Sequence, residues 1–81
     1  MIIEVQWFAD FKNEWWDKPE NHTREFLEFE PLTINTKFVA FFYRTAIGPI
    51  EMCTVHMADR GGNFRIDKTY EEMWKILNKD A

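Results

Sequence analysis

Apolar and polar positions alternate along the first ten residues of the chain. One face of an extended segment would carry Ile3, Val5, Trp7, Ala9 and Phe11. This period of two, with β-branched residues at its start, predicts a strand over residues 2–9. Phe8, Phe11 and Trp15 also lie at helical spacing, so a short helical turn over 10–17 is the alternative for the second half.

The next segment is polar before it becomes apolar again. Residues 12–23 contain a proline and few aliphatic side chains, which predicts a loop. Residues 24–30 fit a strand, and a short helix capped by Thr23 is the alternative. In either case we expect Pro31 to end the element, because proline lacks the backbone N–H that both structures use. Residues 32–36 then form a connection.

The middle of the chain contains its longest apolar run. Residues 37–45 are apolar at both odd and even positions, which is typical of a central strand covered on both faces. Residues 48–49 (Gly-Pro) indicate a turn, and residues 50–58 alternate as a second strand. The paired glycines within 59–63 predict a hairpin turn before a short strand over 63–67, because glycine adopts positive φ without steric cost.

The strongest local signal lies near the end of the chain. Thr69 and Glu72 have the spacing of a capping box, in which each side chain bonds the backbone N–H of the other residue. Apolar side chains then recur at helical spacing at Tyr70, Met73, Trp74 and Leu77. This pattern predicts an amphipathic helix over 70–79. We expect the last three of these apolar residues to pack on the sheet.

Together these elements predict a single α+β domain over residues 1–81. We expect a small, mostly antiparallel sheet of four to five strands, closed by the C-terminal amphipathic helix. A chain of 81 residues buries only a modest share of its surface, so each large apolar side chain matters to its stability.

The second half of the chain has a recognisable order of elements. A strand follows Ile34-Asn35-Thr36, a second strand and a glycine turn lie in "EMCTVHMADRGG", and a short strand with a capped helix lies in "NFRIDKTYEEMWKIL". Over residues 34–77 this order resembles that of the small flagellar proteins of the FlbD family and of short phage proteins of the same shape. The resemblance implies a small sheet with a closing helix, and it implies no site residues.

Composition and charge restrict the kind of protein further. The chain is 46% hydrophobic and 17% aromatic, which is far too apolar for a disordered segment. Its net charge of −4 gives no basic footprint for nucleic acid, and no apolar run is long enough to span a membrane. Cys53 is the only cysteine, which excludes an internal disulfide. We therefore expect a cytoplasmic protein that binds neither nucleic acid nor membrane.

Catalytic chemistry finds little support in the sequence. The chain has no serine, which excludes a serine nucleophile. Cys53 and His56 are three residues apart and so would lie on opposite faces of a strand, which argues against a Cys–His dyad. These residues and His22 lack the spacing of a structural zinc site. We expect a protein that is not an enzyme and that uses no cofactor.

The segment around two adjacent tryptophans is the candidate partner-binding site. Its members are Glu14, Trp15, Trp16, Asp17 and Glu20. Tryptophan is enriched at interface hot spots, and a polar surround is typical of an interface rim. This favours a protein-interaction module, such as a small phage-type inhibitor that binds and blocks a larger host protein. The alternative is that both indoles pack against the sheet as part of a small core.

Two further functions are alternatives to that hypothesis. A small ligand or nucleotide would occupy a cavity lined by aromatic side chains, with Arg44 or Arg65 contacting an anionic group. A self-associating structural protein would instead form a homodimer, joined through edge strands or through an exposed aromatic face.

Overall fold

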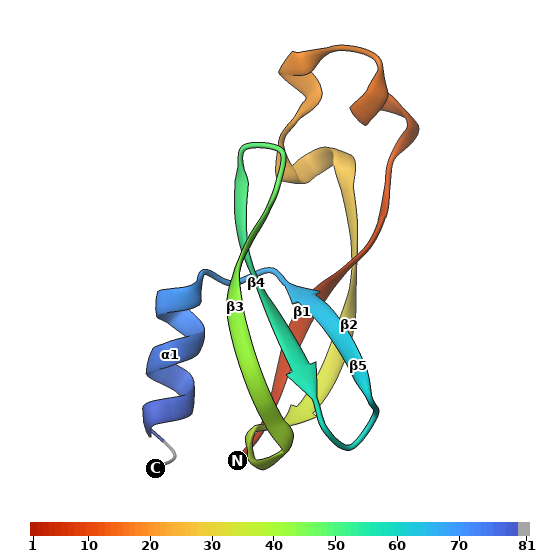
Figure 1. Ribbon diagram of the computed structural model, residues 1–81. Coiled ribbons are helices and arrows are strands. Elements are labelled where there is room, and N and C mark those ends of the chain that lie inside the picture. Colours follow the sequence, from red (N-terminus) through yellow and green to blue (C-terminus); the bar gives the residue numbers. More distant parts are fainter. Residues whose placement is uncertain (80–81) are drawn as a thin grey trace.

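The computed structural model describes residues 1–79 and confirms the α+β class. Five antiparallel strands form one open sheet in the order β2-β1-β5-β4-β3, with one α-helix beside it within the described residues (Figure 1). The elements are β1 (Ile2–Phe11), β2 (Leu27–Asn35), β3 (Val39–Ile47), β4 (Ile50–Met57), β5 (Gly62–Ile66) and α1 (Tyr70–Lys79). The two edges of the sheet are therefore β2 and β3.

β1 extends beyond the strand that the alternation predicts. Its register with β2 shifts between Phe8 and Asp10, which places Phe8 and Phe11 on the same face with ring centroids 4.8 Å apart. The helical alternative for this region is limited to one short 3-10 turn. The loop that leads to β2 consists of three such turns, at Asn13–Trp16, Pro19–Asn21 and Arg24–Phe26.

β2 corrects the prediction that Pro31 ends its element and that residues 32–36 form a connection. The strand continues through this proline, which lies opposite Gln6 of β1. Because β2 is an edge strand, the missing N–H of Pro31 falls on the side that has no neighbouring strand.

β3 is an edge strand, so the prediction of a central strand over 37–45 is wrong. On one face Phe42 stacks on Tyr70 of α1, with ring centroids 4.9 Å apart. On the other face Phe41 and Tyr43 are 52% and 44% exposed. β4 is the strand that is buried on both faces. The apolar pattern of β3 thus combines one packed face with one exposed aromatic face.

The junction between β1 and β5 is the thinnest part of the sheet. These strands share a single residue pair, Trp7 with Ile66, and the N–H of Asp67 donates to the carbonyl of Gln6 at 2.7 Å. The Trp7 ring also meets Phe64 edge to face, with centroids 5.6 Å apart. Side-chain packing therefore contributes much of the contact between the β1–β2 hairpin and the rest of the sheet.

α1 begins where the capping box predicts. The N–H of Thr69 donates to Glu72 Oε1 at 2.9 Å, and the N–H of Glu72 donates to Thr69 Oγ1 at 3.2 Å. Met73 is fully buried against the sheet, whereas Trp74 is 50% exposed, which corrects the prediction that Trp74 packs on the sheet. Consecutive helical residues point about 100° apart, so the burial of Met73 turns Trp74 outward.

Two apolar cores lie on opposite faces of the sheet. The first core, between the sheet and α1, contains Val5, Ile34, Cys53, Val55, Met57, Ile66 and Met73. The second core, on the face away from α1 and beside the loop and the β3–β4 turn, contains Phe8, Trp15, Leu27, Ile47, Ile50 and Met52. The molecule is elongated, with extents of 43 × 22 × 17 Å. No helix of residues 1–79 packs over the lower part of the helix-free face (Figure 1).

Candidate functional site

The structure gives the two adjacent tryptophans different surroundings. Trp15 is only 3% exposed and belongs to the second core, where its ring stacks on His22 with centroids 4.3 Å apart. Trp16 is 69% exposed, and its ring centroid lies 4.9 Å from that of Phe11. Trp15 therefore packs as core, as the alternative reading of this segment expected, and only Trp16 presents its indole to solvent.

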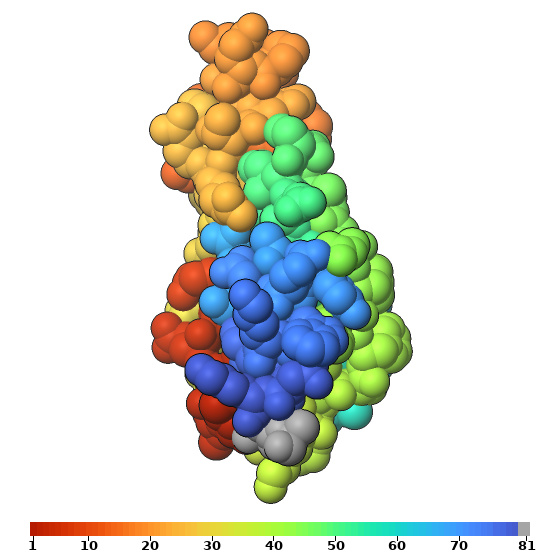
Figure 2. All heavy atoms as spheres, turned by 90° about the vertical axis from the view of Figure 1, so that its left-hand side faces the viewer, coloured from red at the N-terminus to blue at the C-terminus, as the bar shows by residue number. Residues whose placement is uncertain are grey.

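The acidic residues of this segment surround Trp16 on the loop. Glu14, Asp17 and Glu20 are all exposed. Asn21 is buried, and its side-chain Nδ2 donates to the carbonyl of Glu14 at 2.6 Å, which fixes the first turn of the loop. The segment forms one end of the elongated molecule, away from α1 (Figure 2). It offers one exposed indole in an acidic surround, and its role in partner binding stays a prediction.

The two arginines considered as anion contacts lie on opposite faces of the sheet. Arg44 faces α1, where it forms an ion pair with Glu71 and lies 4.6 Å from the ring centroid of Tyr70. The hydrogen bond from Arg44 lowers the pKa of the Glu71 carboxyl below its usual value. Arg65 faces the helix-free side, with its guanidinium 5.0 Å over the ring of Phe8. The two arginines therefore cannot share one ligand.

Exposed aromatic side chains gather around β3. Among the described residues, the large hydrophobic side chains that are exposed are Met1, Ile2, Trp16, Phe38, Phe41, Tyr43 and Trp74. Three of them belong to β3 or to the turn before it. Trp74 lies one helical turn after Tyr70, which contacts β3 through Phe42, so it flanks the same strand from the helix side.

On the helix-free face of the sheet, three rings of β3 and β4 stack in a row. Phe41 lies parallel to His56 of β4, with an interplanar angle of 2° and centroids 4.7 Å apart. Tyr43 stacks beside Phe41 at 6.3 Å. His56 Nδ1 lies 2.5 Å from Oδ1 of Asn63 on β5, which fixes the imidazole in the row. We call Phe41, Tyr43 and His56 the aromatic platform.

The backbone of β3 has hydrogen-bonding groups without a strand to receive them. Gly48 has φ of +56° and precedes Pro49, a combination that fits a type II′ hairpin turn between β3 and β4. Such a turn closes on a hydrogen-bonded pair, here Ile47 with Ile50, and bonded pairs then alternate along the ladder. The N–H and C=O groups of the intervening residues, such as Arg44 and Ala46, therefore point away from β4.

The two edges of the sheet differ in how they resist further pairing. β2 carries Pro31 at its centre and two glutamates, Glu28 and Glu30, just before it, features that discourage another strand. β3 has neither proline nor lysine. Its only charged residue, Arg44, is engaged by Glu71 of the same chain. β3 therefore lacks the sequence features that protect β2.

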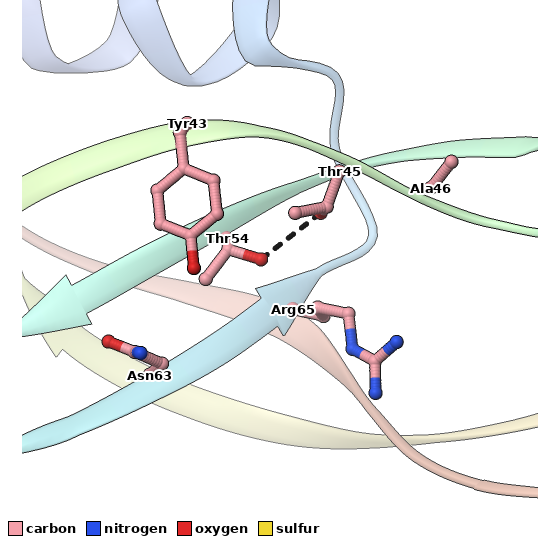
Figure 3. A pocket seen from close by; sticks show the side chains of 6 residues that line it. All are labelled: Tyr43, Thr45, Ala46, Thr54, Asn63 and Arg65. Atoms are coloured by element: carbon pink, nitrogen blue, oxygen red, sulfur yellow. Dashed lines mark hydrogen bonds between the residues drawn. The ribbon is translucent and has the colours of Figure 1, made fainter.

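A recess lies next to the aromatic platform on the helix-free face (Figure 3). Its volume is about 510 Å³, and it is lined by Tyr43, Thr45, Ala46, Thr54, Asn63 and Arg65. The hydroxyl of Thr54 donates to that of Thr45 at 3.1 Å. The lining thus comes from β3, β4 and β5 and contains no carboxylate.

Comparisons with protein-family models, curated proteins and solved structures found no match for this chain. The resemblance to the FlbD family stays a prediction.

Groups that would support catalysis or metal binding are kept apart. Burial raises the pKa of the Cys53 thiol to about 11, which opposes formation of the reactive thiolate. Cys53 faces the first core, whereas His56 faces the platform, as the strand spacing predicted. Within residues 1–79, no three His, Cys, Asp or Glu side chains gather to hold a metal ion. None of the described helices is long and apolar enough to cross a bilayer.

Sequence reasoning missed the aromatic platform because it treated residues 37–45 as buried on both faces. Local pattern shows that β3 is apolar, but the position of a strand within the sheet depends on long-range pairing. The edge character of β2 had a local signal in Pro31, since proline inside a strand is confined to edges. β3 carries no such signal in its sequence.

Proposed function

We propose that this chain is a non-enzymatic protein-binding module that takes up an extended segment of a larger partner as an added strand beside β3. The observation that carries the proposal is the difference between the two edges of the sheet. β2 is protected by a proline, whereas nine residues of β3 lie along an edge without such protection. In strand addition, main-chain hydrogen bonds supply affinity and side-chain pockets supply specificity.

The side chains around β3 indicate what kind of segment would fit. Successive residues of an added strand point to opposite faces of the sheet. One set would meet Phe41 and Tyr43 of the platform, and the other set would meet Trp74 on α1. Each of these three side chains keeps about half of its surface exposed in the free protein. A segment with apolar residues on both faces would cover that surface, and we propose this chemistry for the partner.

Strand addition also explains how so small a protein would act as an inhibitor. A segment bound along β3 cannot at the same time pair with its usual neighbouring strand in the partner protein. Trp16 and its acidic neighbours, at the far end of the molecule, would supply a second contact to a large partner. The β3 edge is the primary site in this proposal, because it offers both backbone and aromatic groups.

Capture experiments with matched variants test the proposal. The immobilised protein is exposed to lysate of its native cell, and the retained proteins are compared among wild type, Ala46→Pro, Phe41→Lys and Trp16→Lys. Ala46→Pro removes an N–H that points away from β4, so it blocks pairing and spares the β3–β4 ladder. We expect one protein that wild type and Trp16→Lys retain and that both β3 variants lose.

Two outcomes would contradict the proposal. The first is a retained protein that depends on Trp16 and is indifferent to both β3 variants. The second is a set of retained proteins that is the same for all four chains. Circular dichroism melts of each variant show that it is folded, and light scattering shows whether a second copy of the chain occupies β3 instead.

A further inference from the structure

The recess on the helix-free face has a chemistry of its own, independent of the backbone edge of β3. Figure 3 shows the Thr45–Thr54 hydroxyl pair lying between Tyr43 and Arg65. The volume of about 510 Å³ is within the range of sites for small organic ligands, roughly 300–1,000 Å³. The recess is open and polar, so its ligand must carry polar groups.

The lining offers several hydrogen-bond donors. The oxygen of the Asn63 side chain is taken up by His56, which leaves its NH₂ group as the part available to a ligand. Tyr43 and the threonine pair contribute hydroxyl groups. Arg65 contributes a guanidinium that forms no ion pair with any acid in residues 1–79. These groups together favour a ligand rich in acceptors.

The charge of the recess points to an anion. Arg65 is the only charged residue among the six that line it. Its contact with the Phe8 ring holds the guanidinium in place and offers no negative charge in return. The planar fork of arginine matches the oxygens of phosphate and carboxylate groups. The chain has a net charge of −4, yet the recess contains no carboxylate and one arginine. Its local charge is therefore positive.

The aromatic platform supplies the second part of the site. Tyr43 belongs both to the platform and to the recess, so a planar group could lie on the platform while an attached anion reaches Arg65. β3 and β5 are two strands apart, which separates their backbones by about 10 Å. Because the side chains of Tyr43 and Arg65 extend from these strands toward the recess, the sugar and phosphate of a nucleotide are long enough to join them.

We infer that this recess binds a mononucleotide, with its phosphate on Arg65 and its base stacked on the ring of Tyr43 at the end of the aromatic platform. Bases stack on aromatic side chains with little dependence on base identity, so the site selects the class of ligand more than the base. A free mononucleotide is favoured over a polynucleotide. A strand of nucleic acid needs several phosphate contacts, and the recess offers one arginine in an acidic protein.

Nuclear magnetic resonance titrations of the ¹⁵N-labelled protein test this inference. The probes are AMP, adenosine, inorganic phosphate and a short single-stranded oligoadenylate. We expect AMP to shift the signals of Tyr43, Thr54 and Asn63, and to bind at least about tenfold more tightly than adenosine or phosphate. Arg65→Gln should weaken AMP binding by about tenfold or more. Arg44→Gln, an exposed arginine on the other face, is the matched control and should leave AMP affinity unchanged.

Several results would overturn the inference. AMP at millimolar concentration could leave the recess signals unmoved, or Arg44→Gln could weaken binding as much as Arg65→Gln. Phosphate binding as tightly as AMP would identify an adventitious anion site. An oligoadenylate that binds far more tightly than AMP would identify a polynucleotide surface. Arg65→Gln should leave partner capture through β3 intact, so failure of this inference is distinguishable from failure of the proposed function.

Discussion

Trp15 and Trp16 show how the same residue type takes different roles at neighbouring positions. Trp15 fills the second core and contacts His22 and Phe11, and its ring lies within 3.3 Å of the position a Cβ would take at Gly48. Any side chain at Gly48 would therefore press on this indole, in addition to the strain of its positive φ. Trp16 has no comparable packing and exposes most of its surface.

This difference predicts unequal costs of truncation. Trp15→Ala should lower the free energy of unfolding by about 3–5 kcal/mol, because it removes a large buried side chain and leaves a cavity. Trp16→Ala should lower it by less than about 1 kcal/mol, because that side chain is already exposed. Urea denaturation followed by circular dichroism measures both. Similar losses for the two variants would contradict the difference in exposure between Trp15 and Trp16.

The buried thiol predicts a pH dependence on the alkaline side. Burial raises the pKa of Cys53 from 9.0 to about 11. The folded protein therefore keeps its thiol proton where the unfolded chain has lost it, so stability falls as pH rises through this interval. The contribution is complete below pH 9.0, the ordinary value of the thiol.

Cys53→Ala is the variant that checks this contribution. Its free energy of unfolding should fall less steeply between pH 9 and 11 than that of wild type, the interval set by the two pKa values of the thiol. A thiol reagent at pH 8 should modify wild type only after denaturant is added. Rapid modification of the folded chain would show that Cys53 is accessible.

At the scale of elements, the capping box predicts a measurable share of the stability of α1. Thr69→Ala should lower the free energy of unfolding by about 1 kcal/mol, because it leaves the N–H of Glu72 without its acceptor. The N–H of Thr69 lowers the pKa of Glu72, so the contribution of that carboxylate is present above pH 4.5 and is lost as pH falls below it.

Measurements at two pH values separate the two halves of the capping box. The difference between wild type and Glu72→Gln should be larger at pH 7 than well below the ordinary carboxyl pKa of 4.5. Lys75→Ala, an exposed position on the same helix, serves as control and should change stability by less than about 0.5 kcal/mol. A pH-independent difference for Glu72→Gln would show that the charge plays no part.

The elements that could be predicted from the sequence are those defined by local chemistry. The capping box fixed the start of α1, and the paired glycines fixed the β4–β5 turn, where Gly61 has φ of +62°. The order of strands depends on pairing between distant segments, and the edge position of β3 was missed for that reason. The platform and the recess follow from that order, because they join residues of three strands.

At the scale of the whole molecule, the protection of one edge limits how the chain can assemble. If β3 accepts a strand as proposed, the protected β2 edge means that copies pairing through β3 stop at two. Pro31→Thr would restore an outward N–H on β2 and give each copy two open edges, which allows chains of unlimited length. We expect this variant to show light scattering that grows with concentration beyond that of a dimer. Scattering equal to that of wild type would contradict the protective role of Pro31.

The thin junction between β1 and β5 has a practical consequence for engineering. A cut in the turn between β2 and β3 would divide the chain into a hairpin and a remainder that meet mainly through side chains and a single paired position. An isolated two-stranded hairpin is marginally stable at best in water. The hairpin piece would therefore gain its structure only on reunion with the remainder, and the pair would work as a split reporter whose signal depends on two fused proteins being brought together.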